Sequence, residues 1–176
     1  MKKAILYCMP LLFLGVVSCK DKPQSNIIIA HRPVVVKQQK PQAIGDAERT
    51  SNISWVGSKY TVKVSVKCDT SLPLATDGST KYYDNRVNIS ILRADGTSFF
   101  NRTFTKSDFK PYVDDNYYDG GALLGIVFDK VDGESLKFAV SVGNPDKTTD
   151  EFVPLELTVN HVGGASIEKA NNEDEQ

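Results

Sequence analysis

Cysteine and histidine are scarce in this 176-residue chain, and neither sign of charge dominates. The sequence has 3 cysteines, 2 histidines, and 21 basic against 22 acidic residues, for a net charge of −1. This balance argues against a strongly basic nucleic-acid binder, and the chain is too short for a TIM barrel. A hydrophobic content of 40% is typical of globular proteins and argues against disorder along the whole chain. We therefore expect one globular domain.

The chain also lacks an apolar run long enough for a permanent transmembrane helix. Its longest run extends from Ala4 to Val17, follows Lys2 and Lys3, and is interrupted by proline and glycine. A helix that spans a bilayer needs about 20 apolar residues. A positive start followed by a short apolar run is typical of a secretion signal, so residues 1–18 are predicted to be a signal peptide.

The signal ends in Val16-Val17-Ser18-Cys19, which resembles the lipobox of bacterial lipoproteins. In that family the cysteine becomes the first mature residue and is acylated, so the resemblance implies lipidation at Cys19. Each buried methylene contributes about 0.8 kcal/mol, so two or three acyl chains hold a small domain on a membrane. The alternative is an ordinary secretory signal in which the cysteine is incidental.

The three cysteines leave no pair for a disulfide in the mature domain. Cys8 would leave with the signal and Cys19 would carry lipid, so only Cys68 remains. Cys68 continues the apolar face of a predicted strand and is interpreted as a small buried hydrophobic residue rather than a reactive thiol.

Composition divides the mature chain into three parts. Residues 19–49 contain lysine, glutamine and proline with little periodicity, and are predicted to be the lipidated N-terminus and a flexible spacer. Residues 50–164 carry the predicted folded domain. Residues 165–176 end in a polar, acidic sequence and are predicted to be a disordered tail.

Alternation with a period of two dominates the folded part. Side chains from Tyr60 to Cys68 alternate between apolar and polar, which predicts a strand with one buried face. The last predicted strand, from Val153 to Val159, alternates in the same way. Because Pro154 lacks a backbone donor, this strand is expected at a sheet edge or to start after the proline.

The first predicted hairpin, from Arg86 to Phe104, turns at Asp95-Gly96. A two-residue loop pairs Val87 with Phe104, Ile89 with Arg102 and Ile91 with Phe100, which places most apolar side chains on one face. A three-residue loop with a glycine bulge is the alternative. In the preferred pairing, Arg102 faces inward and is expected to extend to the rim or pair with a carboxylate.

In the second predicted hairpin, from Ala122 to Val142, the same test favours a three-residue loop at residues 132–134. That loop pairs Phe128 with Phe138, Ile126 with Val140 and Leu124 with Val142, and it places Asp129 opposite Lys137. Seven or eight short strands follow from the whole pattern, which predicts an all-β antiparallel β-sandwich. A small closed barrel is the alternative.

Three segments of the folded part resemble those of a known family. They are WVGSKY at residues 55–60, YYDNR at 82–86 and RADGTSFF at 93–100. With the lipobox and the proline-containing spacer, they resemble small lipoproteins of Bacteroidetes-type bacteria that carry a domain of unknown function. The resemblance covers almost the whole chain. It implies a β-sandwich in the cell envelope, at the outer membrane, and it implies no activity and no site residues.

Candidate ligand-binding residues lie in the predicted loops. Tyrosine rings can serve as flat platforms for sugars, and carboxylates can accept hydrogen bonds from sugar hydroxyls. The residues that offer this chemistry are Tyr82, Tyr83, Tyr117, Tyr118 and Asp119. The alternative is that these tyrosines pack along the rim of the sandwich.

The acidic segment from Asp114 to Asp119 also suggests calcium binding. The EF-hand pattern fails, because the third position from Asp115 is Tyr117 and the twelfth is Ile126. We therefore predict a solvated turn, no metal site and no cofactor.

No catalytic constellation can be assembled from the sequence. His31 lies in the spacer and His161 near the end of the last strand, without a nucleophile elbow. Trp55 is interpreted as a core aromatic residue. The favoured function is a non-catalytic, lipid-anchored envelope domain that contacts another envelope component. A carbohydrate-binding module is the second hypothesis. The third is a small hydrolase, for which Asp114 and Asp119 are the candidate acids.

Overall fold

The computed structural model describes residues 39–170 of the chain. The predicted signal peptide, Cys19 and most of the predicted spacer lie outside the described residues. The described part contains eleven strands, a 3-10 helix and a short α-helix. In chain order these elements are β1 (Gln42–Ala43), β2 (Ala47–Trp55), β3 (Ser58–Cys68), β4 (Ala75–Asp77), β5 (Thr80–Tyr83), β6 (Asn85–Arg93), β7 (Ser98–Phe104), the 3-10 helix η1 (Lys106–Tyr112), α1 (Asp115–Asp119), β8 (Ala122–Asp132), β9 (Ser135–Gly143), β10 (Phe152–Asn160) and β11 (Ala165–Lys169).

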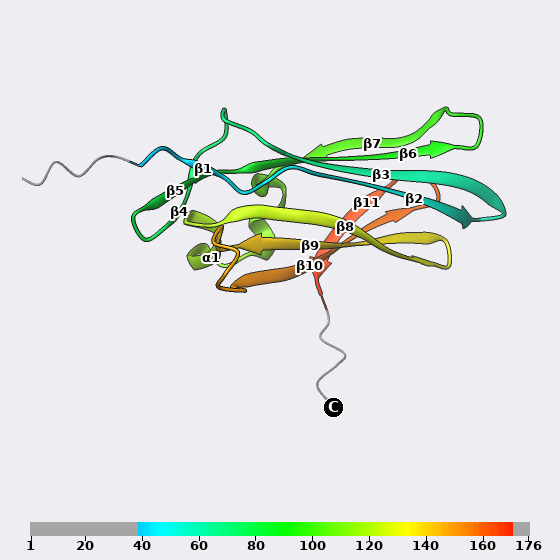
Figure 1. The fold of residues 1–176 in the computed structure, drawn as a ribbon. Coiled ribbons are helices and arrows are strands. Elements are labelled where there is room, and N and C mark those ends of the chain that lie inside the picture. The colour runs from blue at the N-terminus through cyan, green and yellow to red at the C-terminus, as the bar shows by residue number, and fades with distance from the viewer. Residues whose placement is uncertain (1–38, 171–176) are drawn as a thin grey trace, which may run out of the picture. The chain divides into compact units, whose positions relative to one another are not determined.

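Two four-stranded antiparallel sheets face each other (Figure 1). One has the strand order β2-β3-β6-β7 and the other the order β11-β10-β9-β8. A third, small sheet has the order β1-β5-β4, in which β1 runs parallel to β5. The prediction of an all-β sandwich is confirmed, because the two large sheets remain separate and do not close into the alternative barrel. Side chains from both sheets form one continuous core.

The strand predicted from Tyr60 to Cys68 is β3, at the centre of its sheet. Val62, Val64 and Val66 point into the core, whereas Lys63 and Lys67, at alternating positions, are exposed. β3 pairs with β2 on one side and β6 on the other. The period-two pattern thus identified both the strand and its buried face.

The predicted register of the first hairpin is confirmed, but the predicted two-residue loop is wrong. Val87 pairs with Phe104, Ile89 with Arg102 and Ile91 with Phe100. The loop has three residues, since the backbone N–H of residue 93 donates to the carbonyl of residue 97. Gly96 at the turn has a φ of +82°. A bulge at residue 99 restores the predicted register, because the extra residue there compensates for the longer loop.

In the second hairpin the predicted central pairs are confirmed, but the pairing at both ends of the hairpin differs from the prediction. Phe128 lies opposite Phe138, with ring centroids 5.5 Å apart, and Ile126 lies opposite Val140. The loop has two residues, because residues 132 and 135 pair directly. A bulge at Asp129 moves that residue out of register, so Lys130 is the residue opposite Lys137.

The other end of β8 contains a second bulge, which corrects the predicted pair of Leu124 and Val142. Leu123 is the residue opposite Val142, and its side chain is fully buried. Leu124 is displaced to the outer face of the sheet, where it packs against a small cluster that includes Ile44 and Ala122. This displacement places an apolar side chain on the outer face of the sheet.

The folded domain extends beyond both of its predicted boundaries. The predicted spacer extends to residue 49, yet β1 begins at Gln42 and β2 at Ala47. The predicted tail begins at residue 165, yet Ala165–Lys169 forms β11 and pairs with β10. Ile167 in β11 packs against the core, and this contact accounts for the ordered strand in a polar sequence.

The prediction for Pro154 is also wrong. β10 starts at Phe152, before the proline, and it lies between β9 and β11 instead of at an edge. The carbonyl of Pro154 accepts a hydrogen bond from the N–H of Ala170. A proline is tolerated here because it stands near the beginning of the strand, where few ladder bonds require its missing donor.

The 3-10 helix η1 follows β7 and is capped by Thr105 and Asp108. Thr105 precedes the helix, and the Asp108 carboxylate accepts hydrogen bonds from the Thr105 backbone N–H at 2.9 Å and the Thr105 hydroxyl at 3.3 Å. Ser107 contacts only the Thr105 hydroxyl. Within residues 39–170, neither helix is long and apolar enough to cross a membrane.

Candidate functional site

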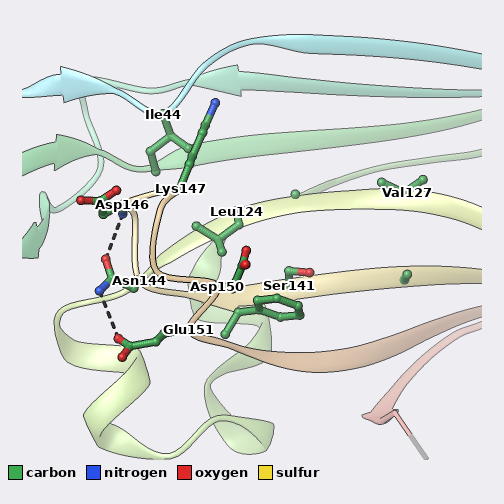
Figure 2. Close-up of a pocket in the computed structure, with 12 residues that line it drawn as sticks. Ile44, Leu124, Val127, Ser141, Asn144, Asp146, Lys147, Asp150 and Glu151 are labelled. Atoms are coloured by element: carbon green, nitrogen blue, oxygen red, sulfur yellow. Dashed lines mark hydrogen bonds between the residues drawn. The ribbon is translucent and has the colours of Figure 1, made fainter. Parts of the chain in front are cut away.

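A hollow lies on the outer face of β8 and β9 (Figure 2), and we call it the β8 groove. Its volume is about 380 Å³. Outer faces of sheets in a sandwich are normally polar, whereas this one is lined largely by apolar side chains. The lining residues are Ile44, Leu124, Gly125, Val127, Ala139, Ser141, Asn144, Asp146, Lys147, Asp150, Glu151 and Phe152.

The floor of the β8 groove consists of small residues at paired positions. Gly125 lies opposite Ser141, and Val127 lies opposite Ala139. The missing side chain at Gly125 and the methyl group of Ala139 leave space above the sheet. Leu124, placed outside by the bulge, forms an adjoining wall. The hollow therefore follows from local strand geometry as well as from residue size.

Two apolar side chains of the groove are exposed to solvent: Val127 of the floor, and Phe152. Val127 is 43% exposed and Phe152 is 42% exposed. Exposed apolar surface around a concavity is characteristic of a binding site, because a ligand that covers it releases water from that surface.

The segment between β9 and β10 forms the polar side of the β8 groove (Figure 2). The Asn144 side chain organises it, since its Nδ2 donates to Glu151 at 3.3 Å and its Oδ1 accepts from the Asp146 N–H at 2.9 Å. Asp150 adopts a φ of +50°, a conformation unusual for any residue other than glycine. The segment therefore has a defined conformation that brings three carboxylates to one rim.

The three rim carboxylates differ in the number of hydrogen bonds that they accept from the protein. Asp146 accepts hydrogen bonds from the N–H and the hydroxyl of Thr148, at 2.9 and 2.8 Å, and these bonds lower its pKa. Glu151 receives only the bond from Asn144, and Asp150 receives no side-chain hydrogen bond or ion pair from any residue in 39–170. Asp150 and Glu151 thus retain oxygens available to a ligand.

Lys147 is the one basic residue of the β8 groove. Figure 2 shows its side chain extending toward Ile44 and away from Glu151. Its ammonium lies 3.3 Å from the position that a Cβ on Gly45 would occupy. Asp146 also lies at the Ile44 end, where it lines a further hollow with Lys147. The carboxylates away from the ammonium are those of Asp150 and Glu151, the two residues that precede Phe152 in the chain.

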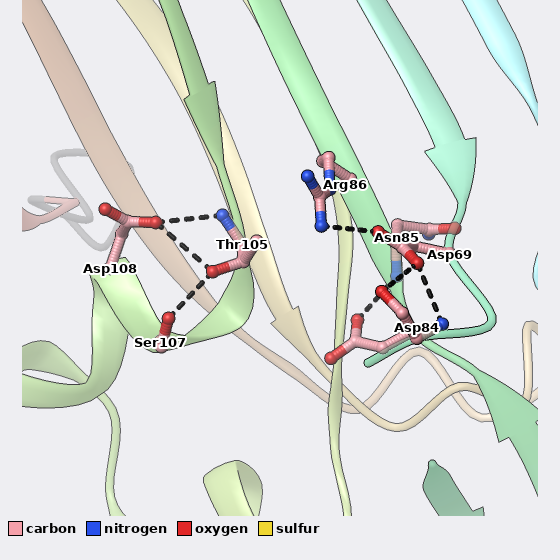
Figure 3. Close-up of polar contacts among 8 residues, drawn as sticks. Asp69, Asp84, Asn85, Arg86, Thr105, Ser107 and Asp108 are labelled. Atoms are coloured by element: carbon pink, nitrogen blue, oxygen red, sulfur yellow. Dashed lines mark hydrogen bonds and ion pairs between the residues drawn. The ribbon is translucent and has the colours of Figure 1, made fainter. Parts of the chain in front are cut away.

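A second polar cluster is buried between the sheets and contains Asp84 and Asn85 (Figure 3). Asp84 Oδ1 accepts hydrogen bonds from the N–H groups of Asn85, at 2.7 Å, and Leu123, at 2.8 Å. Asn85 Nδ2 donates to the Leu123 carbonyl at 2.9 Å. These bonds join the start of β6 to β8 on the opposite sheet.

Lys106 is the cation nearest to this buried cluster. Its ammonium donates to the carbonyls of Tyr118, at 2.8 Å, and Gly121, at 2.7 Å. Burial raises the pKa of Asp84, although its hydrogen bonds and Lys106 oppose the rise. Burial likewise lowers the pKa of Lys106 against the attraction of Asp84 and Asp119. Because Asp84 is only 2% exposed and does not line the β8 groove, we interpret the cluster as a structural link.

The structure does not gather the predicted tyrosines into one platform. Tyr82 packs against the small cluster around Ile44, and Tyr83 is half-buried in β5. Tyr118 packs against the main core, with the ammonium groups of Lys106 and Lys110 at 4.8 and 5.1 Å from its ring centre. The more exposed residues of the set are Tyr117, at 40%, and Asp119. Glycan binding by these residues remains a prediction.

Within the acidic segment, Asp115–Asp119 forms the short, largely exposed helix α1 instead of an open turn. Asp114 precedes the helix, and its carbonyl accepts hydrogen bonds from the N–H groups of Tyr117 and Tyr118. Among residues 39–170, no three histidine, cysteine, aspartate or glutamate side chains are grouped closely enough to hold a metal ion.

The remaining residues singled out from the sequence are buried, partly buried or paired with a charged side chain. Arg102 reaches the rim and pairs with Asp108 at 3.1 Å, as expected. Trp55 is 2% exposed in the core, as expected. Cys68 is half-buried, and burial raises the pKa of its thiol. His161 lies just after β10, with its Nδ1 3.2 Å from Glu134.

Sequence reasoning missed the β8 groove. One signal was present, because Val127 occupies an outward position where alternation leads us to expect a polar residue. The other lining residues gave no signal, since the bulge moved Leu124 outward and the β9–β10 segment read as an ordinary polar loop.

The chain matches a known protein family over most of its length. A family described as Domain of unknown function (DUF4738) matches residues 29–167, most of the chain. No curated protein matches the sequence.

Proposed function

We propose that this chain, which belongs to the DUF4738 family, is a lipid-anchored, non-catalytic domain of the bacterial cell envelope that binds another envelope component. The observation that carries the binding role is the β8 groove, an apolar hollow on a sheet face that would otherwise be polar. The lipobox-like sequence ending in Cys19 supports the anchored state and the envelope location.

A binding role agrees with the chemistry of the groove residues. The lining includes carboxylates, an amide, a lysine and one serine, and it contains no histidine or cysteine. Ser141 has no histidine beside it in the lining that would form a Ser-His pair. Shape and apolar surface are what it provides, and these serve recognition.

Anchoring and recognition can be tested together in cells that express the protein. We expect a fatty-acid analogue with an alkyne tag to label the wild-type protein. Cys19→Ser should abolish labelling, and Cys8→Ser should retain it because that residue lies inside the predicted signal. A photoreactive amino acid at Val127 should form a discrete adduct with an envelope component. The same group at Asn101, an exposed residue of β7, should not.

The two parts of the proposal can fail separately. Equal labelling of the wild-type and Cys19→Ser proteins would refute the lipid anchor. Indistinguishable adducts at Val127 and Asn101 would refute a role for the β8 groove in binding.

A further inference from the structure

The β8 groove extends beyond its main hollow along one strand. A second hollow of about 220 Å³ shares Ile44, Leu124, Gly125, Val127 and Lys147 with it. A third, of about 260 Å³, again includes Val127. Both further hollows also include residues of β2 and β3, among them Arg49 and Val64. The concave surface therefore follows β8 along the side that faces β2. An elongated surface of this kind suits an extended chain better than a compact small molecule.

β8 is also an edge strand. In its sheet it is hydrogen-bonded to β9 alone, and no backbone ladder joins it to β2 of the opposite sheet within residues 39–170. At the start of this edge, the backbone of Leu123 already bonds Asp84 and Asn85. Beyond Leu123, no backbone hydrogen bond from within residues 39–170 occupies the other edge, which is therefore available for pairing. Extended peptides commonly bind by adding a strand to such an edge, with alternate side chains entering adjacent pockets.

The charge of the rim restricts which chain fits. The main hollow is lined by three carboxylates, of Asp146, Asp150 and Glu151, and one ammonium, of Lys147. Arg49 lines the two further hollows and lies outside the main one. Asp146 is occupied by its own turn and Lys147 extends toward the opposite end, as Figure 2 shows. The remaining free charge is negative and lies beside the exposed ring of Phe152. It complements a cationic side chain that follows an apolar one.

We propose that the β8 groove binds an extended polypeptide segment of an envelope partner, in which a lysine or arginine is flanked by aliphatic side chains. The aliphatic groups cover Val127, Leu124 and the floor at Gly125, and the cation lies at the acidic rim that Asp150 and Glu151 provide. This inference rests on the proposed binding function and specifies the class of its partner.

The test uses three acetylated, amidated tripeptides, Leu-Lys-Leu, Leu-Gln-Leu and Leu-Glu-Leu, titrated into the isotopically labelled full chain carrying Cys19→Ser. We expect the lysine peptide to shift the backbone amide signals of Leu124, Val127 and Phe152. Its affinity should exceed that of the glutamine peptide by about fivefold at low salt, as two exposed charge contacts allow. The glutamate peptide should bind weakest.

Two variants separate the charge contribution from the apolar one. Asp150→Asn with Glu151→Gln should remove the preference for lysine over glutamine, because asparagine tolerates the positive φ and glutamine still accepts the bond from Asn144. The matched control is Asp115→Asn with Asp132→Asn, two exposed acids outside the groove, and it should keep the preference.

Gly125→Val should block all three peptides. A Cβ at this position meets no atom within 4 Å, so the new side chain fills the groove without displacing the fold. Unchanged amide signals outside the groove would verify that the variant is folded.

Several outcomes would overturn the inference. They are equal binding of the three peptides, signal changes that map away from β8, no binding by any peptide, or n-hexylamine binding as tightly as the lysine peptide. The last result would indicate a small-amine site. None of these results alters the Cys19 labelling or the Val127 adduct, so the proposed function stands or falls separately.

Discussion

The single side chain of Asp84 makes several interactions that stabilise the fold. It is 2% exposed and accepts hydrogen bonds from two backbone N–H groups, one of which belongs to the opposite sheet. Without that carboxylate, both donors would be buried without partners. The attraction between Asp84 and Lys106 would also be lost. Burial costs of this kind are larger than the net value of an ordinary hydrogen bond.

We therefore expect Asp84→Ala to lower the free energy of unfolding by about 3 kcal/mol. Urea denaturation can be followed by the fluorescence of Trp55, the only tryptophan, which is buried in the core. Asp115→Ala, at an exposed position, serves as the control and should change stability by less than about 0.5 kcal/mol. Equal effects of the two variants would show that Asp84 has no structural role.

At the scale of elements, β11 extends the second sheet beyond the strand that the sequence marked as its last. It covers the edge of β10 with a ladder from Leu155–Lys169 to Val159–Ala165. Ile167 adds an apolar contact with the core. The acidic and polar character of the chain end hides this strand, because only one of its five residues is a large hydrophobic one.

A chain that stops at Gly164 should lose about 2 to 4 kcal/mol of stability, from the lost ladder bonds and the burial of Ile167. The exposed edge of β10 should also increase aggregation. A chain that stops at Ala170 keeps the strand and is the matched control. Thermal melting and light scattering on both chains test this expectation. Identical behaviour would contradict a stabilising role for β11.

The elements also show what local patterns predict well. Alternation identified β3, and the central pairs of both hairpins followed from placing Phe128, Phe138 and similar side chains on one face. The turns were predicted less well, because a bulge can compensate for one residue of loop length. Phe99 occupies one such bulge and packs edge-on against Trp55, with ring centroids 5.4 Å apart. Nothing local to residue 99 marks that contact.

At the scale of the whole molecule, several carboxylates make stability depend on pH. Hydrogen bonds from Ser71, Thr97 and Thr148 lower the pKa values of Asp69, Asp95 and Asp146, respectively. A hydrogen bond from Lys137 lowers that of Glu156. Each group contributes stability above its unfolded pKa, and that contribution is lost as the pH falls through the folded pKa. Asp84 has the opposite sign, since its raised pKa favours the folded state at low pH.

Glu156 offers the clearest test of this dependence. It pairs with Lys137, whose side chain is 16% exposed, and joins β9 to β10. Glu156→Gln should lower the free energy of unfolding at pH 7 by about 1 kcal/mol. It should also reduce the loss of stability below pH 4.5, the ordinary pKa of the group. Glu168→Gln, which removes a more exposed carboxylate 4.0 Å from Lys137, should have a smaller effect. Parallel pH profiles for both variants and the wild type would refute the assignment.

The sequence alone determined the strand β3, its buried face, and the central pairs of the two hairpins, because alternation with a period of two is a local property of the chain. It also carried the lipobox resemblance at Cys19, which the described residues do not reach. Only the tertiary structure decided the bulges in β8, the burial of Asp84 and the β8 groove. These features depend on segments far apart in the chain: Ile44, Val127 and Asp150 come together through the packing of the sheets and the segment between β9 and β10.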